Sequence, residues 1–165
     1  ITDGQLFLES DLFFAGQRPA VNVGLSVSRV GGAAQAPIMK KSVGSIRLDL
    51  AQYRERQVFS QFGGDLDEQT RRELRYGAGL MQLLRQKNQS PLSLWEQVVT
   101  LLCARQQLFC DVPVQEIKAV QRELLDYFER RHSTLCLKIE HERLYTEEIA
   151  QSVLRAAEEF FAQRA

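Results

Sequence analysis

An isolated arginine, Arg29, is the residue of this chain best suited to act on a phosphate. It follows residues 21–27, where valine and leucine alternate with small or polar residues in strict period two, a pattern typical of a strand with one buried face. Gly31 and Gly32 come soon after it and permit a tight turn. The pattern predicts that Arg29 stands at the end of a strand, where its guanidinium can bind phosphate oxygens through a planar fork that lysine lacks.

The other parts of a catalytic site are missing from the sequence. It contains no GxxxxGK[ST] phosphate loop, and no Ser/His/Asp or Cys/His nucleophile set can be assembled. An arginine without its own phosphate loop fits a group that acts in trans, because an arginine from a neighbouring subunit stabilises the negative charge of phosphoryl transfer. The residues alone leave an alternative open, in which Arg29 caps the strand or pairs with a nearby acid.

The three cysteines predict reduced, buried thiols. Their number is odd and no CxxC pair occurs, so a disulfide framework is not indicated. Cys103 and Cys110 would share one face of a helix, near enough in the sequence to suggest a metal site with His132 or His141. Structural zinc sites use closely spaced ligand pairs, which are absent here, so we expect no metal.

Composition excludes two further classes of protein. The 21 basic residues are balanced by 21 acidic ones, so the chain lacks the basic surface on which nucleic-acid binding depends. No apolar run approaches the roughly 18 residues that span a bilayer, and we expect no direct membrane insertion. The 165 residues, 44% of them hydrophobic, suffice for one sizeable core.

Two helices are predicted in the first half of the chain. Periodicity favours one long helix from Ile38 to Phe62, with Pro37 in its first turn and Gly63-Gly64 at its end. Asp65-Leu66-Asp67 supplies acceptors that can cap the next helix, which is predicted to run to about Arg85.

The second half predicts three more helices. Ser93 and Glu96 have the spacing of a capping box, Pro113 can begin a helix that ends near Arg131, and Thr146 can cap the last one. A short apolar segment at 135–139 lies between the last two. The predicted fold class is mainly α, an antiparallel helical bundle preceded by short β-strands, with the domain boundary between residues 1–36 and 37–165.

Four blocks of the sequence resemble the alpha subunits of the rotary F-type ATP synthases. They are Ile-Thr-Asp-Gly-Gln at residues 1–5, Arg-Pro-Ala-Val-Asn at 18–22, Gly-Leu-Ser-Val-Ser-Arg-Val-Gly-Gly-Ala-Ala-Gln at 24–35 and Leu-Ala-Gln-Tyr-Arg-Glu at 50–55. The resemblance covers nearly the whole chain and is strongest over residues 1–67. It implies a C-terminal fragment, in which residues 1–36 are the last strands of an α/β nucleotide-binding domain and residues 37–165 are the helical C-terminal domain.

The resemblance also implies a role for the arginine. In that family the arginine at this place reaches into the catalytic site of the neighbouring beta subunit, where ATP is made or hydrolysed during proton transport. Arg29 would act there in trans, and Ser26 and Ser28 would position it. The fragment alone is expected to be inactive.

A second nucleotide site is implied by the same resemblance. The family's alpha subunit holds a regulatory nucleotide whose base contacts an Arg-Pro pair, here Arg18-Pro19, and two glutamines in a loop between helices. Gln86 matches the first glutamine, whereas the second position holds Asn88, which is one methylene shorter. ATP or ADP with Mg²⁺ would bind the full subunit, and none is expected to bind this fragment, which lacks the phosphate-binding part. The alternative is a solvated polar loop.

The partners implied are beta subunits in an alternating alpha/beta hexamer and the gamma subunit of the central stalk. The segment 65–67 resembles the alpha loop near that stalk, although a helix cap explains it equally well. The complex would lie on the cytoplasmic face of the cell membrane, or on the equivalent organelle membrane, with this subunit peripheral. The alternative function is a non-enzymatic helical interaction module of a related rotary or secretion-type ATPase.

Overall fold

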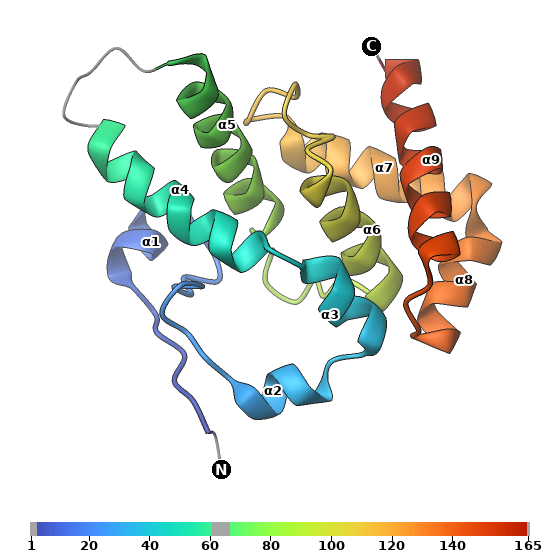
Figure 1. Ribbon diagram of the computed structural model, residues 1–165, viewed down its shortest axis with the longest axis horizontal. Helices are drawn as coiled ribbons and strands as arrows, with labels where there is room; N and C mark the ends of the chain where they lie inside the picture. Colours follow the sequence, from blue (N-terminus) through green and yellow to red (C-terminus); the bar gives the residue numbers. More distant parts are fainter. Residues whose placement is uncertain (1–2, 61–66, 165) are drawn as a thin grey trace. The chain divides into compact units, whose positions relative to one another are not determined.

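The computed structural model describes residues 3–60 and 67–164, and these are mostly helical (Figure 1). The prediction of a mainly α fold is confirmed. The helices are α1 (Ser10–Phe14), α2 (Arg29–Ala34), α3 (Pro37–Val43), α4 (Ile46–Ser60), α5 (Glu68–Leu83), α6 (Leu94–Arg105), α7 (Ile117–Arg131), α8 (Ser133–Glu142) and α9 (Glu147–Arg164).

The chain divides into two compact units. The first combines Ile1–Ala34 with Ser45–Ser90, and the second combines Gln35–Gly44 with Pro91–Ala165. Each unit is therefore built from two separate stretches of sequence. The predicted domain boundary between residues 1–36 and 37–165 stays a prediction.

In the first unit α4 packs against α5 (Figure 1). The helices approach closely at Gly77, where an added Cβ would lie 2.3 Å from the ring of Tyr53. Beside this contact the Tyr76 hydroxyl donates a hydrogen bond to the Asp49 carboxylate at 2.9 Å. Asp67 caps α5 by accepting a hydrogen bond from the Thr70 backbone N–H at 2.7 Å, as predicted. Asp65, Leu66 and Gly63-Gly64 lie outside the described residues.

The strand predicted at residues 21–27 is not formed. Pairing in this part of the described chain is limited to one isolated antiparallel bridge between Leu8 and Val21. Residues 23–25 form a turn, in which Ser26 N donates to the carbonyl of Asn22 at 3.0 Å. A period-two pattern forms a strand only where a neighbouring strand completes its hydrogen bonds. Here the backbone N–H groups of Leu25 and Ser26 bond to Asn22 instead.

The single long helix predicted from Ile38 to Phe62 is also wrong. α3 ends at Val43, Gly44 adopts a φ of 48°, and α4 begins at Ile46. Glycine adopts a positive φ at little cost, so the chain can turn there. The Arg105 guanidinium then donates to the carbonyl of Lys41 at 2.7 Å, which satisfies an end group of α3.

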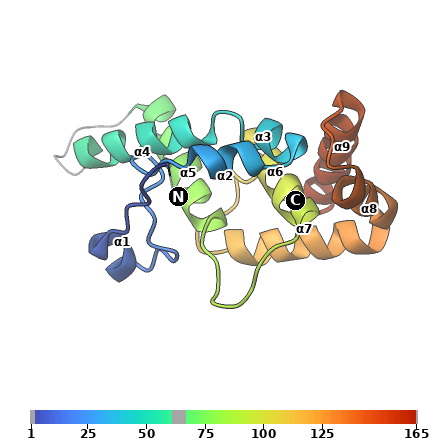
Figure 2. The ribbon, with the colours of Figure 1, turned by 90° about the horizontal axis from the view of Figure 1, so that it is seen from below.

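The second unit is a bundle in which α6 packs against α3, α7, α8 and α9 (Figure 2). Its core consists of fully buried apolar side chains, the largest of which are Ile38, Val98, Val99, Ile117, Val120, Leu124, Phe128, Ile139, Ile149 and Val153. The predicted capping box at the start of α6 is present, with Ser93 N donating to the Glu96 carboxylate at 2.5 Å. Thr146 Oγ1 accepts from Ile149 N at 3.2 Å and caps α9 as predicted.

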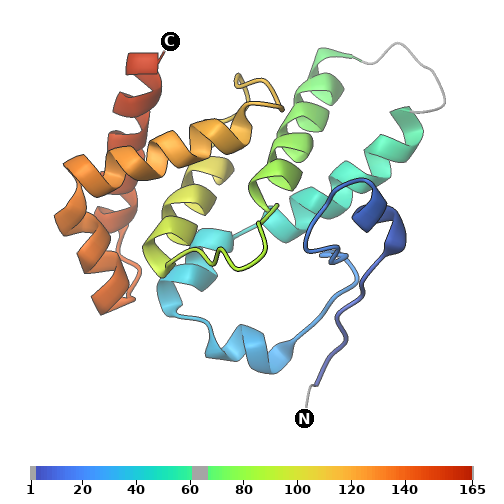
Figure 3. The same ribbon diagram turned by 180° about the vertical axis from the view of Figure 1, so that it is seen from behind.

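Two predictions in this unit are corrected. Residues 113–116 form a turn closed by a 2.8 Å hydrogen bond from Glu116 N to the Pro113 carbonyl, so α7 begins only at Ile117. The apolar segment at 135–139 belongs to a helix, α8, which follows α7 directly (Figure 3). Its buried residues, Cys136 and Ile139, lie three apart, as expected for one face of a helix. The apolar segment is too short for its periodicity to distinguish a helix from a strand.

Candidate functional site

Arg29 lies at the start of α2, in the first compact unit, rather than at the end of a strand. Its side chain is 78% exposed, and its Nε lies 3.0 Å from the carboxylate of Asp3. The same carboxylate accepts a hydrogen bond from Val30 N at 3.0 Å. Asp3 thus contacts both the guanidinium and the first turn of the helix that carries it. The ion pair is made through Nε, and the arginine side chain as a whole is largely exposed.

The two serines predicted to position Arg29 both make hydrogen bonds to the local backbone. Ser26 Oγ accepts from Phe7 N at 3.0 Å. Ser28 Oγ accepts from Gly31 N at 3.0 Å, which is the contact an N-cap residue makes to its helix. Their roles toward Arg29 stay predictions, but both hydroxyls hold the backbone on either side of Val27.

Sequence reasoning missed the segment that lies against this loop. Gln5 O accepts a hydrogen bond from Val27 N at 2.9 Å. Gly4 is so close to Val27 that an added Cβ would lie 1.9 Å from its carbonyl oxygen. A glycine beside an aspartate near the start of the chain was the signal available, but nothing in the local pattern indicates which distant loop they contact.

The residues of the second predicted site come together. Gln86 N donates to the carbonyl of Arg18 at 2.8 Å, which joins the Arg18-Pro19 pair to the loop after α5. Arg85 reinforces this contact, since its guanidinium donates to Ala15 O at 3.1 Å and to the side-chain oxygen of Gln17, a buried residue, at 3.3 Å.

The side chains of this second site are partly engaged. The Arg18 guanidinium carbon lies 4.4 Å from the centre of the Phe13 ring, a cation–π contact. Gln86 donates from Nε2 to the Ser90 carbonyl at 2.9 Å, and Asn88 is exposed in the same loop. Arg18, Gln86 and Asn88 are exposed, so a ligand could reach them, and their contact with a nucleotide stays a prediction.

The cysteines lie in the second unit, and none is in a disulfide. Burial raises the pKa of the Cys103 thiol to about 12 and that of the Cys136 thiol to about 11. Burial thus disfavours the thiolate, which is the reactive form of cysteine. Among the described residues no group of three His, Cys, Asp or Glu side chains could hold a metal ion.

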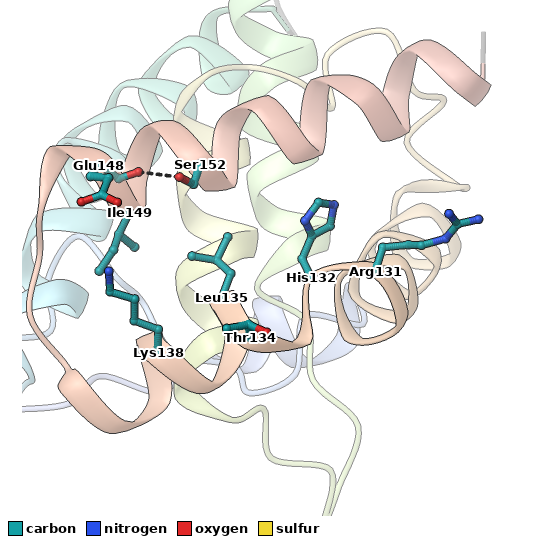
Figure 4. Close-up of a pocket in the computed structure, with 8 residues that line it drawn as sticks. All are labelled: Arg131, His132, Thr134, Leu135, Lys138, Glu148, Ile149 and Ser152. Carbon is teal, nitrogen blue, oxygen red and sulfur yellow. Dashed lines mark hydrogen bonds between the residues drawn. The ribbon is translucent and has the colours of Figure 1, made fainter.

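A hollow of about 380 Å³ lies between α8 and α9 of the second unit (Figure 4). None of the predicted site residues lines it. In the close-up Arg131 points away from the hollow, while His132 and Lys138 extend toward α9 and the acidic Glu148 lies on the opposite wall. The charges around the hollow are therefore mixed and select no class of ligand. Its lining residues are Arg131, His132, Thr134, Leu135, Lys138, Glu148, Ile149 and Ser152.

No described helix is both long enough and apolar enough to cross a membrane.

Comparison with known proteins places these sites in context. The family model described as the ATP synthase alpha/beta chain, C terminal domain, matches residues 35–160. ATP synthase subunit alpha of Clostridium kluyveri is 44% identical over 160 residues, 97% of this chain and 32% of that protein. The corresponding subunit of Thermobifida fusca is 48% identical over 97% of the chain and 29% of its own length. ATP synthase subunit alpha 2 of Legionella pneumophila (strain Corby) is 49% identical, again over 97% of the chain and 31% of its own length. The chain thus spans about a third of the length of these relatives.

Proposed function

The chain belongs to the ATP synthase alpha/beta chain family, and on that premise we propose that it forms part of the alpha subunit of a proton-translocating ATP synthase. Arg29 would act in trans at the catalytic site of a neighbouring beta subunit. The subunit would assemble with beta subunits in an alternating hexamer around the gamma subunit, as a peripheral part of a membrane-bound complex. The relatives' shared name, at 44% to 49% identity, supports this proposal.

The observation that carries the catalytic role is the exposure of the Arg29 guanidinium. A side chain that is 78% exposed is accessible to a group on another polypeptide. The contact with Asp3 at 3.0 Å is made through Nε. Two parallel N–H groups match the oxygens of a phosphoryl group, whose charge increases during transfer.

The test replaces Arg29 in the full-length subunit assembled with beta subunits. Multisite ATP turnover should fall by about 10³-fold or more in R29A, the range observed for arginines that act in trans. R29K should restore little of it, because an ammonium group cannot form the planar fork. Nucleotide binding should persist in both variants, since the arginine contributes mainly when charge develops.

A matched control distinguishes catalysis from the loss of a surface charge. Arg75 on α5 forms an ion pair with Glu68 at 3.0 Å and is also largely exposed, so R75A removes a comparable arginine from the same compact unit. Turnover of R75A should be unchanged. Unchanged turnover in R29A would contradict the proposed role and favour the non-enzymatic interaction module.

We also propose that Arg18-Pro19, Gln86 and Asn88 face the base of a regulatory nucleotide in the full subunit. The 2.8 Å hydrogen bond from Gln86 N to Arg18 O supports this, because it brings the two predicted elements of the site to one place. Q86A should weaken retention of ATP or ADP with Mg²⁺ by the alpha subunit, measured as nucleotide bound after gel filtration. The 165-residue chain itself, which contains no GxxxxGK[ST] phosphate loop, should show no rise in melting temperature with millimolar ATP, and a rise would contradict the expectation that it does not bind ATP on its own.

A further inference from the structure

Asn22 is a buried polar residue at the centre of the loop that leads to Arg29. Only 4% of it is exposed, and each of its four polar groups is engaged. Its backbone N–H donates to Phe7 O at 2.8 Å, and its carbonyl accepts from Ser26 N at 3.0 Å. Its side-chain Oδ1 accepts from Leu25 N at 3.1 Å, and its Nδ2 donates to the carboxylate of Glu9. A buried residue with all of its polar groups paired holds one conformation of its surroundings.

Glu9 connects this asparagine to a helix. One carboxylate oxygen accepts from Asn22, and the other accepts from Arg54 Nη2 on α4 at 2.7 Å. The hydrogen bond from Asn22 and then that from Arg54 hold the pKa of the Glu9 carboxyl below its ordinary value. The carboxylate is therefore charged at neutral pH, and both donors remain bound to it.

The chain between Asn22 and Arg29 is anchored at Leu25, Ser26 and Val27. Leu25 and Ser26 are bound to Asn22, as described above. Ser26 Oγ also accepts from Phe7 N at 3.0 Å, and Val27 N donates to Gln5 O at 2.9 Å. The backbone two residues before Arg29 is thus already constrained, and the constraint leads back through Asn22 and Glu9 to a residue on a regular helix.

We propose that Asn22, Glu9 and Arg54 form a positioning network for Arg29, which holds the arginine loop on α4 so that the guanidinium meets the reacting phosphate at the correct place. This inference rests on the proposed function of Arg29. None of the three residues need touch substrate, and each would act through the loop. A displacement of about 1 Å in a group that stabilises a transition state can cost about 100-fold in rate, so loss of the network should be smaller in effect than loss of the arginine itself.

The test is a double-mutant cycle in the full-length subunit assembled with beta subunits. N22A and E9Q are each made alone and together with R29A, and kcat and KM for ATP are measured at saturating and limiting concentrations. Each single variant should lower kcat by about 10- to 100-fold with little change in KM. In the R29A background neither should lower kcat further, because there is no guanidinium left to misplace.

Three further variants separate positioning from general destabilisation. R54K retains a cation that can reach Glu9 and should keep more turnover than R54A. E68Q removes a carboxylate whose ion pair with Arg75 at 3.0 Å is of similar length, in the same compact unit, and should leave kcat unchanged. E9Q preserves the size and shape of the side chain, and assembly and nucleotide binding of each variant are measured alongside turnover. A loss caused only by misfolding would lower assembly in both the presence and the absence of Arg29.

The outcomes are distinguishable from failure of the proposed function. Unchanged turnover in R29A would overturn the role of Arg29 itself, and with it the network. A large loss in R29A together with normal kcat in N22A and E9Q would overturn the network alone. A further fall in kcat when N22A or E9Q is combined with R29A would also overturn the network, because it would show that Asn22 and Glu9 act independently of the arginine.

Discussion

The segment from Asp3 to Val30 and the helices α6–α9 achieve their order in different ways. The helices bury a continuous set of apolar side chains, among them Phe128 and Leu124, which are fully inaccessible. The segment instead leaves Leu6, Leu8 and Phe14 between 68% and 84% exposed, and it is held by backbone hydrogen bonds and by the contacts of Asn22 and Glu9. Burial is nondirectional and tolerates small displacements, whereas hydrogen bonds fix positions but weaken when charge or geometry changes. We therefore expect the segment that carries the proposed catalytic arginine to be more sensitive than α6–α9 to single polar substitutions.

The largest expected effect in the helices comes from removal of a core aromatic side chain. F128A should lower the free energy of unfolding by about 3 to 5 kcal/mol, since the site is fully buried and the cavity cannot collapse completely. F14A removes the same ring from an 84% exposed position and should change it by less than about 0.5 kcal/mol. Urea unfolding followed by circular dichroism measures both. Similar losses in the two variants would refute the contrast between the regions.

A smaller effect is expected where α4 and α5 touch. G77V places a side chain where even a Cβ would lie 2.3 Å from the ring of Tyr53, and should destabilise the first unit by about 1 to 3 kcal/mol. Apart from its chain neighbours and the backbone of its own helix, Gly32 in α2 has no heavy atom within 4 Å of such a Cβ, so G32A is the control and should be close to neutral. Thermal unfolding compares the two variants. Equal melting temperatures for G77V and the unmodified chain would show that the helices can separate there freely.

The capping box of α6 should contribute less again. S93A removes the hydroxyl that donates to the Glu96 carboxylate at 2.8 Å in the capping box. It should lower the free energy of unfolding by about 1 kcal/mol, the usual value for an N-cap serine. In α8 the N-cap residue is His132, so the exposed Ser133 that follows it is not the cap, and S133A should be nearly neutral. Urea titration with the same slope for each variant tests the difference. A loss in S133A as large as that in S93A would mean that the cap is not its cause.

The smallest effect expected is a pH dependence in the arginine loop. The hydrogen bond from Asn22, and then that from Arg54, lowers the pKa of Glu9 in the folded chain. The stabilisation is therefore complete above the ordinary carboxyl pKa and is lost as the pH falls through the lowered value. Exchange of the Leu25 amide, which is bound to Asn22 Oδ1, should become faster than its intrinsic rate predicts as the solution is acidified.

E9Q provides the control for that measurement. An amide at this position does not titrate, so the protection of Leu25 should be weaker and independent of pH between neutral and acid solution. Val120 in the core of the second unit should show no such change in either chain. A flat profile for Leu25 in the unmodified chain would contradict the role of the charged Glu9 in holding the loop.

Features that depend on a few neighbouring residues were predicted well. Ser93 with Glu96, Asp67 with Thr70, and Thr146 with Ile149 form the expected caps, because the two groups in each pair are only three residues apart. Predictions that extended one pattern over a long stretch failed. Residues 21–27 pair with the segment beside them through only one isolated bridge, between Leu8 and Val21, and the helix that begins at Pro37 ends before Gly44, which adopts a positive φ.

The candidate sites were predicted only in part, for the same reason. Arg29 and Gln86 could be selected by type and by family resemblance, and the contact between Gln86 and Arg18 agrees with their being close. Asp3 and Arg54 lie in blocks that carry the family resemblance, but nothing in the sequence around Asp3, Glu9 or Arg54 indicated which residues they contact. Each becomes informative through a partner that is 13 to 45 residues away in the sequence, as in the Glu9 contacts with Asn22 and Arg54.

By itself, the sequence of this protein determined its helical character, the caps of three helices and its family, because helical periodicity and capping act over three or four residues and the family blocks are contiguous. Only the tertiary structure decided that a short aspartate-glycine segment lies against the arginine loop and that Glu9 joins Asn22 to α4. Those contacts depend on the path of the chain through turns and loops, where each residue has several backbone conformations of similar energy and no periodic pattern selects among them.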